Sequence, residues 1–223
     1  MPFRVTEIID YLTEPELLAW MLRTPKAKRE ASSKDSLLIG TRVDLLIQES
    51  LFPPSPSLST LSQPLPQEFL PEHKIAISSC MNAWEKFKVD RPEIVAGIKS
   101  IQTEFEHDGI IGHPDIYYED ASRWGIIDVK TSRTMYPRYW TQTAKYTDIA
   151  KPSRHPEDTK PRFIGILRLD KESGNYHYME IDDEEQIKYE ISVFQAYQIA
   201  YMHNSTQREF IRQQLEQELI NVK

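Results

Sequence analysis

The sequence predicts a mixed α/β protein in which a central mixed β-sheet is flanked by helices. Apolar residues recur at helical spacing over about the first 95 positions and again after position 182. Between these stretches, short β-rich runs alternate with turn signals. Of the 223 residues, 39% are hydrophobic and 27% are charged, which excludes a collagen, a wholly disordered chain and a membrane bundle.

We expect residues 1–223 to form one domain with three parts. Residues 1–95 form a helical part, which contains a loop rich in proline and serine at 52–71. Proline lacks an N–H donor and disfavours helix in the residue before it, so this loop is predicted to be extended. Residues 96–181 form the sheet core, and residues 182–223 form C-terminal helices.

Two patterns predict the helices of the first part. Thr13 followed by Glu16 is typical of a capping box at the start of a helix. Apolar residues at helical spacing then predict helices over residues 36–51 and 72–88.

Alternation predicts the strands of the core. Residues 98–106 and 110–118 are expected to pair as a hairpin, because Asp-Gly at 108–109 is a strong turn signal. A third strand is expected over residues 125–131. The later elements are a helix at 137–149, a hairpin at 162–182, a helix at 182–203 and a charged helical tail at 206–223.

Charge and cysteine content narrow the class of protein. The net charge of −7 excludes a basic coat that binds nucleic acid by bulk charge, although a local basic groove is still compatible with it. The single cysteine, Cys80, excludes an intrachain disulfide framework and a four-cysteine metal centre. Charged residues interrupt the first twenty positions, so no signal peptide is expected. We therefore expect an intracellular, cytoplasmic protein without a membrane span.

The strand around Asp128 carries the first chemical signal. Side chains alternate along a strand, so Asp128 and Lys130 share one face while Ile127 and Val129 face apolar packing. One interpretation is a structural salt bridge. The other is a metal-binding carboxylate beside a cation that handles a water or a phosphate.

Asp115, in the preceding strand, strengthens the second interpretation. Hairpin pairing brings Asp115 toward Asp128, and two carboxylates at one place repel each other unless a cation neutralises them. Mg²⁺ and Mn²⁺ prefer oxygen ligands of this kind. Glu104 is the candidate for a third carboxylate, and Glu106, which is in phase with it, is its rival.

Gln142 and Tyr146 lie four residues apart on a predicted helix and so share a face. Such a pair can hydrogen-bond a phosphate, and the tyrosine can stack on a base. The alternative is a helix that simply packs Tyr146 and solvates Gln142.

Taken together, the acid, G-x-x-D, D-x-K and Q-x-x-x-Y motifs resemble the PD-(D/E)XK nuclease superfamily. The match is closest to its RecB-like branch, which includes lambda-type and mitochondrial genome maintenance exonucleases. The motifs stand here as Glu104, GHPD at 112–115, DVKTS at 128–132 and QTAKY at 142–146. The resemblance covers about residues 36–170 without 52–95. It implies a restriction-endonuclease-like core and a hydrolase acting in DNA recombination or repair.

An upstream motif departs from the family pattern. Relatives often have G-T-x-x-H, whose histidine can bind a second metal, whereas this sequence has Asp44 after Gly40 and Thr41. An aspartate can also bind a hard cation. The alternative is a solvated helix residue.

The resemblance implies roles for the matched residues. Asp115 and Asp128, assisted by Glu104, would hold one or two Mg²⁺ or Mn²⁺ ions, with Asp44 and the Val129 carbonyl as further ligands. Lys130 would orient water or stabilise charge on the phosphate. The residues expected to contact DNA are Gln142, Tyr146, Thr131, Ser132 and Arg133.

Three functional hypotheses follow. The first is a metal-dependent exonuclease acting on single-stranded DNA or DNA ends, with an endonuclease as the nearest enzymatic alternative. The second is an inactive nucleic-acid-binding module on a nuclease-like fold. The third is a subunit that recruits a protein partner through the proline-rich loop or the C-terminal helix.

Overall fold

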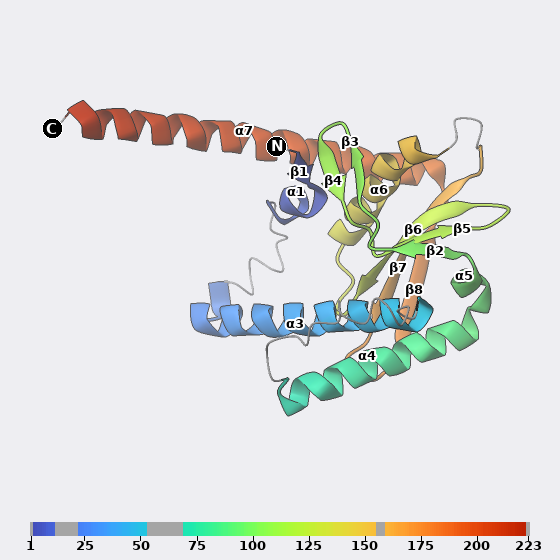
Figure 1. Cartoon of the computed structure of the whole chain (residues 1–223). Helices are drawn as coiled ribbons and strands as arrows, with labels where there is room; N and C mark the ends of the chain where they lie inside the picture. Colours follow the sequence, from blue (N-terminus) through green and yellow to red (C-terminus); the bar gives the residue numbers. More distant parts are fainter. Residues whose placement is uncertain (1, 12–21, 53–68, 155–158, 222–223) are drawn as a thin grey trace, which may run out of the picture.

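The computed structural model describes residues 2–11, 22–52, 69–154 and 159–221. Within these residues, five strands form the main sheet in the order β2-β5-β6-β7-β8. Their bounds are β2 Ile98–Ile101, β5 Ile116–Glu119, β6 Trp124–Lys130, β7 Arg162–Leu169 and β8 Tyr176–Ile181. β6 is parallel to β7, and the other neighbours are antiparallel. Helices lie on both faces of this mixed sheet (Figure 1), so the predicted fold class is confirmed.

Three further strands of the described chain form a small second sheet, in the order β1-β4-β3. These are β1 (Phe3–Arg4), β3 (Phe105–His107) and β4 (Ile110–Gly112). Asp108 and Gly109 join β3 to β4 with φ angles of 50° and 71°. This is the left-handed backbone that an Asp-Gly hairpin turn requires, so the predicted turn is confirmed.

The two continuous strands predicted for residues 98–106 and 110–118 are wrong. Gln102 has a φ of 52°, which ends β2 and lets the chain leave the main sheet. After the β3–β4 hairpin, the chain returns as β5 past Pro114, which has no N–H to donate to a strand ladder. Each predicted strand is therefore divided between the two sheets.

One face of the main sheet is covered by α3 (Lys26–Leu51) and α4 (Pro71–Asp90), and the short α5 (Pro92–Ala96) follows. Side chains of α3, α4 and the facing strands form one apolar core, which includes Val43, Trp84, Phe87, Ile127 and Val129. This core also buries Cys80, which is a free thiol. Packing against Val129 holds α3 near the end of β6.

The opposite face is covered by α6 (Arg138–Ala150), which continues into the 3-10 turn Lys151–Ser153, and by the first part of α7 (Glu184–Asn221). Apolar clusters there include Ile126, Tyr146, Ile164, Ile187 and Phe194. The helix α1 (Val5–Tyr11) packs in the same region. Figure 1 shows the C-terminal part of α7 extending beyond the rest of the molecule.

The other predicted elements compare with the structure as follows. The helices expected at 72–88 and 137–149 are confirmed as α4 and α6, and the hairpin at 162–182 as β7 and β8. The helix expected at 36–51 begins earlier, at Lys26. The C-terminal region is one continuous helix, where two helical segments were expected. The capping box at Thr13 and most of the proline-rich loop lie outside the described residues.

In the described part of the chain, no helix has both the length and the apolar character needed to cross a membrane.

Candidate active site

β6 lies between β5 and β7 in the main sheet and carries Asp128 and Lys130 at its C-terminal end. Ile127 and Val129 join the core beneath α3 and α4. Asp128 and Lys130 alternate with them and so lie on the face covered by α6. Asp128 is 1% exposed, which requires a compensating charge or a proton.

Asp115 lies beside Asp128. Ile116 of β5 pairs with Ile127 of β6, and the same antiparallel register places Asp115 opposite Asp128. Asp115 Oδ2 accepts a hydrogen bond of 2.7 Å from the backbone N–H of Val129. Two carboxylates from neighbouring strands therefore meet at the end of the sheet.

Gln102 holds Asp115 from the other side. Its Nε2 donates to Asp115 Oδ1 at 2.7 Å, and its backbone N–H donates to the Asp115 carbonyl at 3.1 Å. The left-handed φ of 52° at Gln102 is uncommon for a residue other than glycine. Gln102 is not among the site residues predicted from the sequence, because no local pattern identifies a glutamine that adopts such a backbone.

Asp44 of α3 is the third carboxylate of the cluster. It shares a narrow gap with Gln102, Asp115 and Val129. Burial, followed by the negative charge of Asp115, raises the pKa of Asp44 from 3.8 to about 7. The side chain of Asp44 is therefore close enough to the strand carboxylates for their charges to affect its pKa.

Lys130 forms an ion pair with Asp128, with Nζ 2.6 Å from Oδ2. This Oδ2 is buried, and the ammonium group of Lys130 is its charged partner. Burial raises the pKa of Asp128, and the charge of Asp115 adds to this effect while Lys130 opposes it. Burial alone would lower the pKa of Lys130, but the charges of Asp128 and Asp115 outweigh it and the net pKa is raised. Lys130 is therefore a cation at neutral pH.

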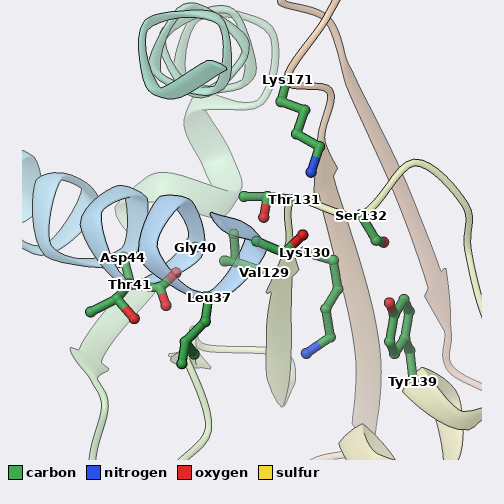
Figure 2. Close-up of a pocket in the computed structure, with 11 residues that line it drawn as sticks. Leu37, Gly40, Thr41, Asp44, Val129, Lys130, Thr131, Ser132, Tyr139 and Lys171 are labelled. Carbon is green, nitrogen blue, oxygen red and sulfur yellow. The ribbon is translucent and has the colours of Figure 1, made fainter. Parts of the chain in front are cut away.

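A cavity of about 290 Å³ opens beside these groups. Figure 2 shows α3 with Thr41 and Asp44 on one side, β6 with Lys130 in the middle, and Tyr139 of α6 on the other side. The Lys130 Nζ lies 5.0 Å from the centre of the Tyr139 ring. Apolar surface in this cavity comes from residues such as Leu37 and Val129, and its hydroxyl and ammonium groups are supplied by Ser36, Thr41, Thr131, Ser132, Lys130 and Lys171. Hydroxyl and ammonium donors of this kind suit an anionic ligand.

Gln142 and Tyr146 are buried, and Gln142 Nε2 donates to Tyr146 Oη at 3.0 Å. Burial and then the charge of Asp128 raise the pKa of Tyr146, which places this ring next to the carboxylate cluster. Gly112 provides the space for this ring, since a Cβ at Gly112 would lie 2.7 Å from the Tyr146 ring. The pair therefore supports the cluster from behind instead of lying open to a ligand.

The remaining predicted residues divide into two groups. Thr131 and Ser132 line the cavity. Arg133 is exposed and pairs with Glu172. Glu104 lies in the connection between β2 and β3, where its exposed carboxylate pairs with His113 Nε2 at 3.2 Å. Its rival Glu106, on β3, is also exposed.

Within the described residues, no group of three or more His, Cys, Asp or Glu side chains has the geometry to hold a metal ion as it stands. The chemistry of the donor set nevertheless fits a hard divalent cation, because Asp44, Asp115 and Asp128 are all carboxylates. Burial and the neighbouring negative charges raise the pKa of Asp44, which shows that negative charge in this cluster is incompletely compensated. These three residues are the ones that would hold such an ion.

Neither a protein-family model nor a curated protein matches the chain. Among solved structures, it is similar to LHK-Exo in complex with dAMP, with 13% identity over 93% of both chains and a TM-score of 0.39. It is also similar to a phage-related exonuclease from Haemophilus somnus 129PT, with 15% identity over 91% of this chain and 96% of that chain and a TM-score of 0.36. Both identities and both TM-scores are low, so these likenesses carry no argument about the function of this chain.

Proposed function

We propose that this protein is a nuclease that uses Mg²⁺ or Mn²⁺ to hydrolyse phosphodiester bonds in DNA. The observation that carries the proposal is the cluster of Asp44, Asp115 and Asp128 with Lys130, beside a cavity that also presents hydroxyl and ammonium groups. A carboxylate cluster holds cations, and a lysine beside it binds a phosphate, so the two together suit a phosphodiester substrate.

The carboxylates have the metal-holding role. Asp115 and Asp128 would hold one or two ions, with Asp44 and the backbone carbonyl of Val129 as further ligands. When bound, such an ion supplies Lewis acidity toward the phosphate and lowers the pKa of a coordinated water. Gln102 keeps Asp115 in place through its two hydrogen bonds.

Lys130 has the electrostatic role. Its raised pKa keeps the ammonium group charged, and the group lies at the cavity between Asp128 and Tyr139. There it can donate to a phosphate oxygen and stabilise the charge that develops during hydrolysis. The hydroxyls of Thr131 and Ser132 can donate further hydrogen bonds to the same phosphate.

Gln142 and Tyr146 have a positioning role in this proposal. They are buried and bonded to each other, so they order the wall behind Asp128 and do not contact DNA directly. Glu104 and Arg133, which lie in surface ion pairs, are left with a secondary role at most.

One observation favours a second candidate, a module that binds nucleic acid without cleaving it. Both oxygens of Asp115 accept hydrogen bonds from protein donors, and Asp128 is already paired with Lys130. A site that satisfies its own charges in this way needs no ion to fold. The distinction between the candidates is therefore whether the carboxylates release these partners to a cation.

We further propose that the enzyme is an exonuclease on single-stranded DNA or DNA ends, on the basis of the motif resemblance. The test is cleavage of end-labelled linear single-stranded DNA beside the same DNA circularised, with Mg²⁺ or Mn²⁺. Wild type is compared with Asp128→Asn and Lys130→Ala, and with Glu106→Gln as a matched exposed-carboxylate control. Loss of the linear substrate alone, abolished in the first two variants, supports an exonuclease.

The other outcomes are equally informative. Cleavage of the circle as well identifies an endonuclease that uses the same site. Cleavage that persists in both Asp128→Asn and Lys130→Ala rules out this site. Intact binding without cleavage by wild type selects the binding module.

A further inference from the structure

A second, larger cavity lies next to the candidate active site. It has a volume of about 770 Å³ and is formed between the segment leading into α6 and the first turns of α7. We call it the α6–α7 groove, and its lining includes Tyr136, Arg138, Thr141, Tyr189, Glu190 and Tyr197. The chain connects the two cavities directly, because Thr131 and Ser132 line the first and residues 134–137 line the second.

Contacts between cationic and aromatic side chains lead from one cavity to the other. Lys130 Nζ lies 5.0 Å from the Tyr139 ring centre, and Tyr139 meets Tyr136 edge-on at 5.5 Å. The Arg138 guanidinium lies 5.6 Å from the Tyr136 ring centre and 5.9 Å from that of Tyr139. Alternating cations and aromatic rings therefore lead from the candidate catalytic lysine into the groove.

Tyr189 presents an aromatic side chain on the opposite wall. It belongs to α7 and is 64% exposed. An exposed ring beside a concave surface is available to stack on a flat ligand. A volume of 770 Å³ is within the range of sites that hold organic ligands larger than a single ring.

We propose that the α6–α7 groove binds the single-stranded stretch of DNA that adjoins the bond being cleaved, an inference that rests on the proposed nuclease function. Bases stack on Tyr136 and Tyr189, and Arg138 binds the adjoining phosphate. Arg138 pairs with the exposed Asp10 at 3.4 Å, so its guanidinium already lies in an ionic environment at the groove.

Glu190 fixes the orientation of the bound DNA strand. Its carboxylate accepts a 2.5 Å hydrogen bond from Thr141 Oγ1 at the groove wall. A carboxylate repels phosphate but accepts hydrogen bonds from the N–H groups of bases, which include the N3–H of thymine. The sugar–phosphate backbone therefore follows the Arg138 side, and the bases turn toward Glu190 and Tyr189.

A peptide partner is the competing occupant of such a groove. Single-stranded DNA is favoured because the chain that lines the groove leads directly from a cavity whose donors suit a phosphate. A peptide that docked only through apolar contacts would not require a cation such as Arg138 beside two tyrosine rings.

The test measures the binding of a fluorescent twelve-nucleotide oligothymidylate by fluorescence anisotropy. EDTA is present so that cleavage does not interfere. Tyr189→Ser is compared with Ile199→Ser, a control on the same helix at a residue that is 70% exposed and outside the groove lining. Loss of one stacking contact should weaken binding by roughly ten-fold in Tyr189→Ser. Ile199→Ser should bind as wild type does. An abasic oligomer of equal length should bind wild type and Tyr189→Ser equally, because it has no bases to stack.

Equal binding of oligothymidylate by wild type and Tyr189→Ser overturns the inference, and so does a groove that captures peptide but no oligonucleotide. If wild type still cleaves DNA in that case, the nuclease proposal stands and the groove fails alone. If binding depends on Tyr189 but wild type cleaves no DNA, the groove inference stands and the nuclease proposal fails. Photocrosslinking with a 5-iodouracil oligomer is a second readout on the unmodified chain. Adducts on Tyr136 or Tyr189 support the groove, and adducts confined to other surfaces contradict it.

Discussion

Asp44 provides the sharpest test of the carboxylate cluster, because its replacement should stabilise the protein. The raised pKa, about 7 against an ordinary 3.8, means that the folded protein binds the Asp44 proton more tightly than the unfolded chain does. The associated destabilisation is absent below pH 3.8, grows as pH rises, and is complete above about pH 7. Asp44→Asn removes it, so the gain in stability should appear only toward neutral and alkaline pH.

The magnitude follows from the same pKa. A difference of one in pKa corresponds to about 1.4 kcal/mol, which sets an upper bound of about 4 kcal/mol. Because Asp44 is only partly buried, solvent screening reduces the expected gain to about 2 kcal/mol at pH 8. The same substitution should leave the free energy of unfolding nearly unchanged at pH 4.

Urea denaturation in EDTA at pH 4 and pH 8 measures this difference. Glu49→Gln is the matched control, since Glu49 is an exposed carboxylate on the same helix. An Asp44→Asn protein that is no more stable than wild type at pH 8 would refute the electrostatic reasoning. Addition of Mn²⁺ should shrink or reverse the gain, because a bound cation would relieve the repulsion in wild type only.

Three further predictions test the site and its support. Mn²⁺ at a hundred times its dissociation constant should stabilise wild type by about 2.7 kcal/mol and Asp128→Asn by less. If differential scanning fluorimetry detects no shift in the melting temperature of wild type, that result would argue against a metal site. Gln102→Ala should lower both stability and cleavage, whereas Gln102→Gly should regain about 1 kcal/mol by relieving the left-handed backbone but should not regain cleavage. Equal cleavage rates for Gln102→Gly and wild type would show that the amide does not position Asp115. Gly112→Ala should cost about 1–3 kcal/mol in urea denaturation, because its Cβ would lie 2.6 Å from Ile149. Gly40→Ala is the contrasting variant, because Gly40 lies within α3 and its added Cβ would meet only Thr131, at 3.7 Å. A loss of stability in Gly40→Ala would contradict the packing described.

Local patterns in the sequence were sufficient where each residue's neighbours determine its geometry. Alternation along 125–130 placed Asp128 and Lys130 on one face, and the Asp-Gly pair predicted the turn that follows β3. Helical periodicity predicted α4 and α6 to within two residues at each end. In each of these cases, the information lies within a few positions along the chain.

The division of strands between two sheets could not be predicted in the same way. Residues 98–106 and 110–118 show continuous β patterns, because each half pairs with a partner, although the partners belong to different sheets. The break at Gln102 is set by the hydrogen bond that its side chain donates to Asp115, thirteen positions away along the chain. The prediction that Glu104 lies on a strand of the main sheet is therefore wrong. Glu104 lies in a connection and pairs with His113.

The features that escape local rules are concentrated in one place, and this distribution is itself an argument for function. A structural salt bridge would need only Asp128 and Lys130. The fold adds Asp44 and Asp115 to them, although burial and mutual repulsion raise the pKa of Asp44. It also holds Gln102 in an unfavourable backbone conformation to secure Asp115. Each of these features costs stability, and strain of this kind persists at sites where a ligand or a reaction uses it. A cation held by the three aspartates would offset the electrostatic cost and would leave Lys130 available to the phosphate, which accounts for the cluster as a whole.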